Sequence, residues 1–385
     1  MKRIAIFFVI FLGVILAVII PNFAPGRGEQ DFIRYWAASR LLVTGGNPYD
    51  GKELTELQNS TRPELSIKEG DIVEAWNPPW LLLTMLPLGL LPFNAAVPLW
   101  IFLNVLIIVV SLMISWQLSG GKDNQRLFVI VLGAGVLFGN TVILLRLGQI
   151  STLVLISFLI GFWLIQKGHD WLAGIILLIA TIKPQLSYLV LFILLIWTLK
   201  YRRWKILVGM ALSGIAAALF VWLILPEWLS IYIQTISRLP FSIIFTSTLG
   251  SFMSEVFGIS IFKYMAILLL PLAFPLAKNV EKIGWFTTMN LALVISIPLS
   301  IYGFSFDQVV LLPAIVQMVA WITQGRFSSK VAIGIGIGTA ATYALLLWMM
   351  SLKDLPYYWF FWISFLIMCL YLTAWGTIHG KTKPV

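Results

Sequence analysis

The segment WLAGIILLIATIKPQLSYLVLFILLIWTLK, residues 171–200, decides how the chain is threaded through a membrane. It is long enough to form either one kinked membrane helix or two short helices that meet at Lys183 and Pro184. A single helix would carry the basic cluster KYRRWK (200–205) across to the opposite face. Two short helices return that cluster to the inner face, where short basic loops concentrate in membrane proteins.

The charge pattern therefore favours two short helices, 171–182 and 184–199. Pro184 suits the first position of the second helix, where the missing N–H of proline costs nothing. Short or broken helices are tolerated at membrane depth only where they line a cavity enclosed by protein. The segment therefore predicts a cavity near Lys183.

The composition agrees with a chain that is embedded in lipid along its whole length. The 385 residues are 60% hydrophobic and only 11% charged, against about 25% charged residues in a soluble domain. The net charge of +10 falls in short clusters between apolar runs, which is the positive-inside pattern and gives no support for nucleic-acid binding. A single cysteine, Cys369, excludes intramolecular disulfides, and neither histidine lies in a predicted outer segment, so we expect no metal and no cofactor.

We predict one all-α, polytopic domain over residues 1–385, with about twelve membrane helices and both termini on the inner side. The N-terminus resembles a signal peptide but lacks a small-residue cleavage site, so it is interpreted as the first membrane helix. The predicted spans are 4–20, 95–116, 127–145, 150–166, 171–182, 184–199, 206–225, 259–277, 283–303, 307–324, 331–351 and 357–377.

The longest outer connection is predicted between the first two spans, over residues 21–94. Nine of the sixteen acidic residues lie in it, so the chemistry is expected on the outer face. Within it, PPWLLLTMLPLGLLPF (78–93) is apolar but interrupted by prolines and too short to span. We expect it to form a helix that lies at the outer membrane interface.

The stretch DFIRYWAASRLLVTGGNPYD (31–50) begins this outer connection with the pattern of an amphipathic helix. Asp31, Arg34 and Tyr35 share one face with Ala38 and Leu42. The other face is expected to rest in the membrane interface, Gly45-Gly46 to end the helix, and NPYD to form a turn. A purely structural interpretation makes Asp31 a helix cap and lets the arginines contact lipid headgroups.

Four further polar residues stand out because ionisable groups at membrane depth are costly. Arg146 and Gln149 lie at the outer end of a predicted hairpin, Lys183 at the junction of the short helices, and Asp307 at an outer helix start. The structural alternatives are snorkelling for Arg146, a carboxylate or carbonyl partner for Lys183, and a helix cap for Asp307. The chain shows no nucleotide loop and no hydrolase or protease motif. These polar residues instead fit a site that handles a phosphate carried in the membrane. The cations would bind the phosphate, and a carboxylate would act as general base.

The ordered motifs DFIRYWAASRLLVTGGNPYD, NPPWLLLTMLPLGLLPF, RLGQISTLVL and AGIILLIATIKP resemble glycosyltransferase family 87 over roughly residues 25–205. The resemblance implies a GT-C-type membrane enzyme that transfers a sugar, often mannose, from a polyprenyl-phosphate donor with inversion. It also implies Asp31 as the catalytic base and Lys183 as a ligand of the carrier phosphate. The module of about 1–205 would carry this pattern, with variable helices over about 206–385.

The candidate site follows from the motifs and the resemblance together. Asp31 is the expected base, and Lys183, Arg146 and Arg34 are the expected ligands of the donor phosphate. The residues expected to bind substrate are Tyr35, Asn47, Tyr49, Asn77, Gln149 and Asp307. The expected partners are a polyprenyl-phosphate-sugar, a glycolipid or glycan acceptor and membrane lipids, and the expected location is the plasma (inner) membrane.

Three alternatives remain open at this point. A multi-pass transporter or flippase would also contain broken helices and buried charges, but it needs a path open alternately to both faces. A non-catalytic membrane scaffold leaves the ordered polar residues without a purpose. A ligase or polymerase of lipid-linked glycans shares the outer-face chemistry.

Overall fold

The computed structural model of the chain describes residues 31–63, 74–121, 125–238, 246–352 and 355–379. Every regular element in these ranges is a helix, which confirms the prediction of an all-α chain. The predicted first span, 4–20, lies outside the described residues.

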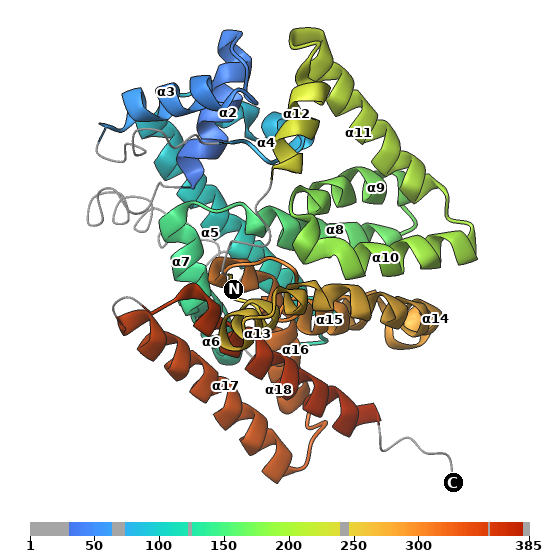
Figure 1. Ribbon diagram of the computed structural model, residues 1–385. Helices are drawn as coiled ribbons and strands as arrows, with labels where there is room; N and C mark the ends of the chain where they lie inside the picture. Colours follow the sequence, from blue (N-terminus) through green and yellow to red (C-terminus); the bar gives the residue numbers. More distant parts are fainter. Residues whose placement is uncertain (1–30, 64–73, 122–124, 239–245, 353–354, 380–385) are drawn as a thin grey trace.

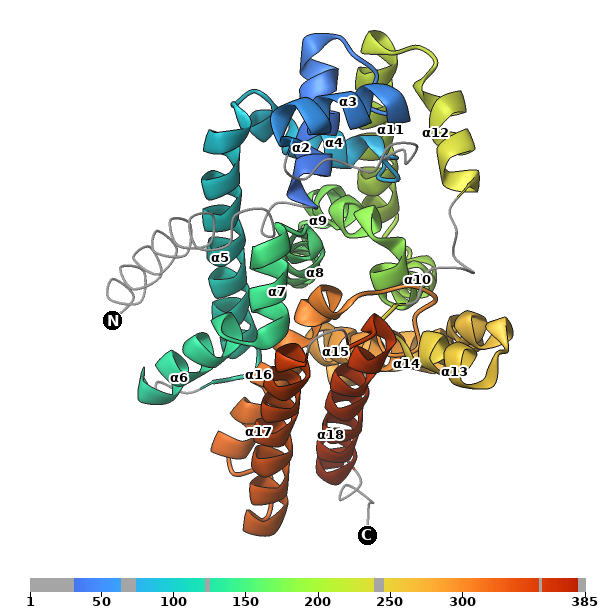
Figure 2. The ribbon, with the colours of Figure 1, turned by 60° about the vertical axis from the view of Figure 1, so that its left-hand side comes forward.

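The upper part of the molecule in Figures 1 and 2 contains helices from two separate regions of the sequence. They are α2 (Phe32–Thr44), α3 (Gly51–Thr61), α4 (Pro79–Gly89), α11 (Lys205–Ile224) and α12 (Trp228–Ser237). Helix α4 packs against both α2 and α11, so the segment that contains α2 and α4 is held by a helix that lies much later in the sequence.

The centre and the lower part are formed by the remaining helices (Figure 1). The centre contains α5 (Phe93–Leu118), α6 (Gln125–Val136), α7 (Gly139–Leu147), α8 (Ser151–Gln166), α9 (Asp170–Leu178), η2 (Ile179–Ile182) and α10 (Pro184–Tyr201). The lower part contains α13 (Leu249–Phe257), η3 (Ser260–Leu272), α14 (Ala273–Ile283), α15 (Trp285–Ser296), η4 (Ser305–Leu311), α16 (Leu312–Thr323), α17 (Ser329–Ser351), η5 (Tyr357–Phe360) and α18 (Phe361–His379).

Seven described helices are long and apolar enough to cross a membrane, and each coincides with a predicted span. They are Phe93–Leu118, Pro184–Tyr201, Lys205–Ile224, Ser260–Ile283, Ser305–Thr323, Ser329–Ser351 and Tyr357–His379. The predicted span 127–145 appears as a pair of helices, α6 and α7, that meet at an angle of 48°. The predicted spans 150–166, 171–182 and 283–303 appear as shorter apolar helices. The chain is thus a polytopic membrane protein.

The break at Lys183 and Pro184 is present as predicted. The 3-10 turn η2 ends at Ile182, and Pro184 is the first residue of α10. Between them the Lys183 backbone has φ −129° and ψ 77°, which is not helical. Helix α4 has 11 residues and a length of roughly 16 Å, too short to cross a bilayer, as predicted for this segment.

Helix α2 differs from its prediction in what covers its apolar face. Phe32, Ile33, Trp36, Ala37 and Leu41 were expected in the membrane interface, but all five are buried inside the protein. Their neighbours are α4 and α5, whose apolar side chains face them. A short amphipathic pattern specifies that a face is apolar, but it does not say whether lipid or another helix covers that face.

Two polar side chains, Asp31 just before α2 and Arg40 toward its C-terminal end, also differ from the structural interpretation. Asp31 precedes the helix, yet its side chain caps no backbone N–H there. The guanidinium of Arg40 donates to the carbonyl oxygens of Gly89 (3.2 Å) and Leu90 (3.4 Å), at the end of α4. Arg40 therefore ties α2 to α4, whereas Asp31 remains available for other partners.

Candidate functional site

A cavity of about 700 Å³ is lined by residues from the upper, central and lower parts of the molecule. It is lined by one side of α2, the segment before α4, the ends of α7 and η2, and the loop that leads into η4. Eight of the ten predicted site residues line it: Asp31, Arg34, Tyr35, Asn77, Arg146, Gln149, Lys183 and Asp307. The cavity near Lys183 that the broken hairpin predicted is therefore present.

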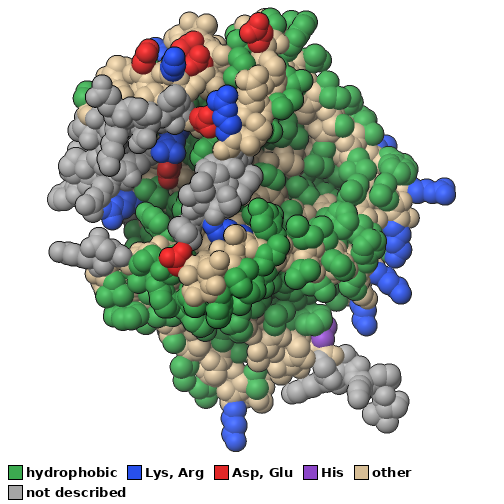
Figure 3. Space-filling model, viewed as in Figure 1, with side chains coloured by type: hydrophobic (Ala, Val, Ile, Leu, Met, Phe, Trp, Pro, Cys, Tyr) green, Lys and Arg blue, Asp and Glu red, His purple; other side chains and the backbone are tan. Residues whose placement is uncertain are grey.

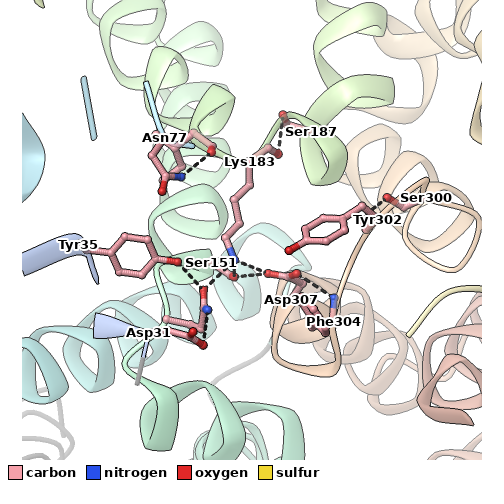
Figure 4. A network of polar contacts seen from close by, with 12 residues as sticks. Asp31, Tyr35, Asn77, Ser151, Lys183, Ser187, Ser300, Tyr302, Phe304 and Asp307 are labelled. Atoms are coloured by element: carbon pink, nitrogen blue, oxygen red, sulfur yellow. Dashed lines mark hydrogen bonds and ion pairs between the residues drawn. The ribbon is translucent and has the colours of Figure 1, made fainter. Parts of the chain in front are cut away.

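The centre of the cavity wall is a buried ion pair between Lys183 and Asp307. Lys183 Nζ lies 2.7 Å from Asp307 Oδ1, and their side chains are only 9% and 1% exposed. The same ammonium donates to Ser151 Oγ (3.0 Å) and to Gln149 Oε1 (2.8 Å). A lysine ammonium has three N–H donors, so all three are used inside the protein (Figure 4).

Both carboxylate oxygens of Asp307 also accept hydrogen bonds. Its Oδ1 accepts from Lys183 and from Ser151 Oγ, and its Oδ2 accepts from the backbone N–H of Phe304 (3.0 Å). The last contact is a helix-capping bond at the start of η4. The structural alternatives considered for Lys183 and Asp307, a carboxylate partner and a helix cap, thus both describe contacts that the structure contains.

Gln149 connects this ion pair to Asp31. Its Oε1 accepts from Lys183 and from the Tyr35 hydroxyl (3.1 Å), and its Nε2 donates to Asp31 Oδ2 (2.7 Å). Burial, and then the carboxylates of Asp31 and Asp307, raise the pKa of the Tyr35 phenol well above its usual value, so this hydroxyl remains a neutral donor. The two carboxylates are therefore connected through the Gln149 amide and the Lys183 ammonium.

Asp31 is the carboxylate that retains acceptor capacity. Its side chain is partly exposed to the cavity and accepts only the bond from Gln149 in the part of the chain that the structure describes. An ionised carboxylate has about four acceptor positions, so Asp31 Oδ1 can still accept from a ligand. Asp307, 1% exposed and bonded at both oxygens, lacks that freedom.

Two guanidinium groups at the cavity have no partner in the described part of the chain. Arg34 on α2 and Arg146 on α7 both line the cavity and are exposed. Neither side chain makes a hydrogen bond or an ion pair within the described ranges. Unpaired guanidinium groups that line a cavity are suited to a bound anion, above all a phosphate.

The structure does not bring Asn47 and Tyr49 to the cavity. Asn47 Oδ1 accepts from the Tyr49 backbone N–H (2.9 Å), and Asn47 thereby forms the predicted turn before α3. Tyr49 is 2% exposed and packs against the rings of Trp228 and Tyr232 on α12. Both residues therefore support the turn before α3 and its packing against α12, and neither lines the cavity.

Sequence reasoning missed Ser151 and Tyr302. Ser151 begins α8 two residues after Gln149 and bridges Lys183 to Asp307, a role that only the folded arrangement shows. Tyr302 lines the cavity, and Figure 4 shows it and Tyr35 on either side of Lys183. It stands five residues before Asp307 in YGFSFD, next to a residue that had been singled out.

The model for glycosyltransferase family 87 matches residues 76–279, which is more than half of the chain. The chain belongs to glycosyltransferase family 87. No curated protein and no solved structure matches it.

Membership of family 87 confirms the resemblance seen in the sequence and makes the protein a membrane glycosyltransferase. The family match begins later and ends later than the resemblance over roughly 25–205. It contains Asn77, Arg146, Gln149 and Lys183 but neither α2 nor η4. Of the eight predicted site residues that line the cavity, four therefore lie within the matched range and four, Asp31, Arg34, Tyr35 and Asp307, lie outside it.

Proposed function

We propose that the protein transfers a sugar, by preference mannose, from a polyprenyl-phosphate donor to a glycolipid or glycan acceptor. The observation that carries this proposal is the presence in a single cavity of one accessible carboxylate, Asp31, and two arginines, Arg34 and Arg146, that have no partner among the described residues. Such a cavity supports the binding of a lipid-linked phosphate at the arginines, with the acceptor hydroxyl at the carboxylate. Family membership supports the transferase class.

Arg34 and Arg146 are assigned to the donor phosphate ahead of Lys183. A guanidinium can bind two phosphate oxygens at once and keeps its charge at any physiological pH. Lys183 can reach a phosphate only by releasing Asp307, Ser151 or Gln149, because its three donors are already used. Its proposed role is therefore to neutralise Asp307 and to hold Gln149, beside the arginines that bind the ligand.

Asp31 is proposed as the general base. It accepts the proton of the acceptor hydroxyl as that oxygen forms a bond to the anomeric carbon from the face opposite the phosphate. The bond between the anomeric carbon and the phosphate oxygen breaks, and its electron pair leaves with the polyprenyl phosphate, whose charge the two arginines stabilise. The anomeric configuration inverts, and Tyr35 and Asn77 contact the substrates from the cavity wall.

The proposed topology places this cavity on the outer face of the plasma membrane, with both termini in the cytoplasm and about twelve spans in one GT-C-like domain. The charge distribution supports it. In Figure 3 the acidic side chains gather in the upper left, whereas basic side chains also lie along the right and lower edges. The turns α10–α11 and α16–α17, which carry exposed basic residues, lie at those edges in Figure 1.

The direct test is a transfer assay with purified protein, radiolabelled polyprenyl-phosphate-mannose and a membrane lipid extract as the source of acceptor. Asp31→Asn keeps the shape of the side chain but removes the base, so the rate should fall by at least about 10²-fold. Glu56→Gln is the matched control, since Glu56 is an exposed acid of the same outer segment that does not line the cavity. Near-normal transfer by Asp31→Asn would exclude Asp31 as the base.

A further inference from the structure

The amide of Gln149 can adopt only one orientation in the folded protein. A lysine ammonium has donors and no acceptor, so the Gln149 atom 2.8 Å from Lys183 Nζ must be the oxygen Oε1. The Tyr35 hydroxyl, whose proton is retained, donates to the same oxygen. The nitrogen Nε2 therefore faces Asp31 and donates to it.

The backbone gives Gln149 little freedom to move away from this position. Gly148 ends α7 in the left-handed conformation with φ +65°, and the Gln149 N–H donates to the Leu144 carbonyl (3.1 Å). The carbonyl of Gly148 is held in turn by the indole N–H of Trp100 (2.8 Å). Gln149 itself is 4% exposed.

We infer that Gln149 is a positioning residue for the base, an inference that rests on the proposed function. Sequence reasoning placed Gln149 among the residues that bind substrate, but both ends of its amide are held by the protein: Oε1 accepts from Lys183 and Tyr35, and Nε2 donates to Asp31. It holds Asp31 Oδ2, so that Oδ1 is the oxygen that faces the acceptor hydroxyl. Lys183 acts on the base through this amide.

Gln149→Glu tests the inference because the glutamate has the same shape and still offers an oxygen to Lys183. Near neutral pH its second oxygen faces Asp31 as a like charge, which displaces the base and should lower the transfer rate by about 10²-fold. As the pH falls, the carboxylate pair takes up one proton, and the resulting O–H replaces the lost N–H donor. Transfer by the variant should therefore recover toward acid pH, where the wild-type rate declines.

Gln185→Glu is the matched control. Gln185 lines the same cavity, and its side chain makes no hydrogen bond within the ranges that the structure describes. The control adds the same charge to the cavity without touching Asp31, so its pH profile should keep the wild-type shape. A control profile that shifts as much as that of Gln149→Glu would show a general effect of charge and overturn the inference.

Gln149→Leu provides a second measurement that does not depend on the folding of the first variant. It removes the donor to Asp31 while Arg34 and Arg146 remain, so kcat should fall at least tenfold with KM for the donor changed less than threefold. A rise in donor KM at unchanged kcat would make Gln149 a substrate ligand and overturn the positioning role. Absence of transfer by the wild-type protein itself would instead remove the proposed function on which the inference rests.

Discussion

Two aspartates in one cavity have different partners, and those partners separate their roles. Among the described residues Asp31 accepts one hydrogen bond and faces the cavity, whereas Asp307 is buried and bonded at both oxygens. Sequence reasoning could single out both, because charged residues near membrane helices are rare. It could not pair Lys183 with Asp307, since 124 residues separate them and only tertiary packing brings them together.

The buried ion pair predicts that removal of the cation alone strongly lowers the stability of the protein. Removal of both charges should lower it much less. Lys183→Met leaves the Asp307 carboxylate, 1% exposed, without its cation, which should cost about 3–5 kcal/mol. The double variant Lys183→Met with Asp307→Asn removes both charges and should recover much of that loss. Thermal unfolding in detergent measures both effects. A single variant as stable as the wild type would mean that the pair contributes nothing to folding.

The free arginines predict an effect on binding without an effect on folding. Arg146→Ala and Arg34→Ala should each raise the KM for the donor about tenfold or more, because a charge-assisted bond to phosphate is worth roughly 1.5–3 kcal/mol. Arg326→Ala is the matched control, since Arg326 is exposed and lies away from the cavity. Donor KM values equal to that of the control would place the phosphate elsewhere.

At the scale of the element, the sequence predicted the ends of helices well. It predicted less well whether lipid or protein packs on their apolar faces. Gly45 ends α2 in the left-handed conformation as the Gly-Gly pair predicted, and Pro184 begins α10. The covering of α2 was missed because lipid and protein select the same apolar side chains. This matters for function, since burial of α2 against α4 and α5 holds Asp31 at the cavity.

The junction between α7 and α8 predicts a sensitive glycine. A Cβ at Gly148 would lie 2.6 Å from Phe32 Cβ, and its φ of +65° already disfavours any other residue. Gly148→Ala should therefore displace α2 and lower both stability and transfer. Gly168→Ala is the control, because Gly168 has φ +79° but no atom within 4 Å of the added Cβ. Equal losses in the two variants would show backbone strain alone and no link to α2.

At the scale of the whole molecule, the apolar runs and basic loops predicted the positions of the spans, and the break at Lys183 predicted a cavity. The same reasoning could not place the second half of the chain against the first. Asp307 and Tyr302 reach the cavity because η4 packs beside α7 and α8, a long-range contact that has no local signal. The candidate site was therefore predicted as a set of residues but not as a network.

The proposed topology predicts which positions can be reached from outside the cell. In a Cys369→Ala background, which has no other cysteine, Glu56→Cys on α3 and Lys330→Cys on α17 provide exposed thiols at opposite ends of the molecule. A membrane-impermeant thiol reagent applied to intact cells should label Glu56→Cys alone. Labelling of Lys330→Cys alone would reverse the orientation.

The central claim is that the cavity carries out transfer and is not a passage for lipid-linked sugar. Sealed vesicles that contain the purified protein, with labelled polyprenyl-phosphate-mannose in the leaflet that faces the cavity and acceptor lipid beside it, test this claim most directly. We predict that the wild type releases polyprenyl phosphate and forms a labelled product, and that Asp31→Asn forms none. Movement of the intact donor across the bilayer, without product and at the same rate with both proteins, would contradict the account and identify a transporter.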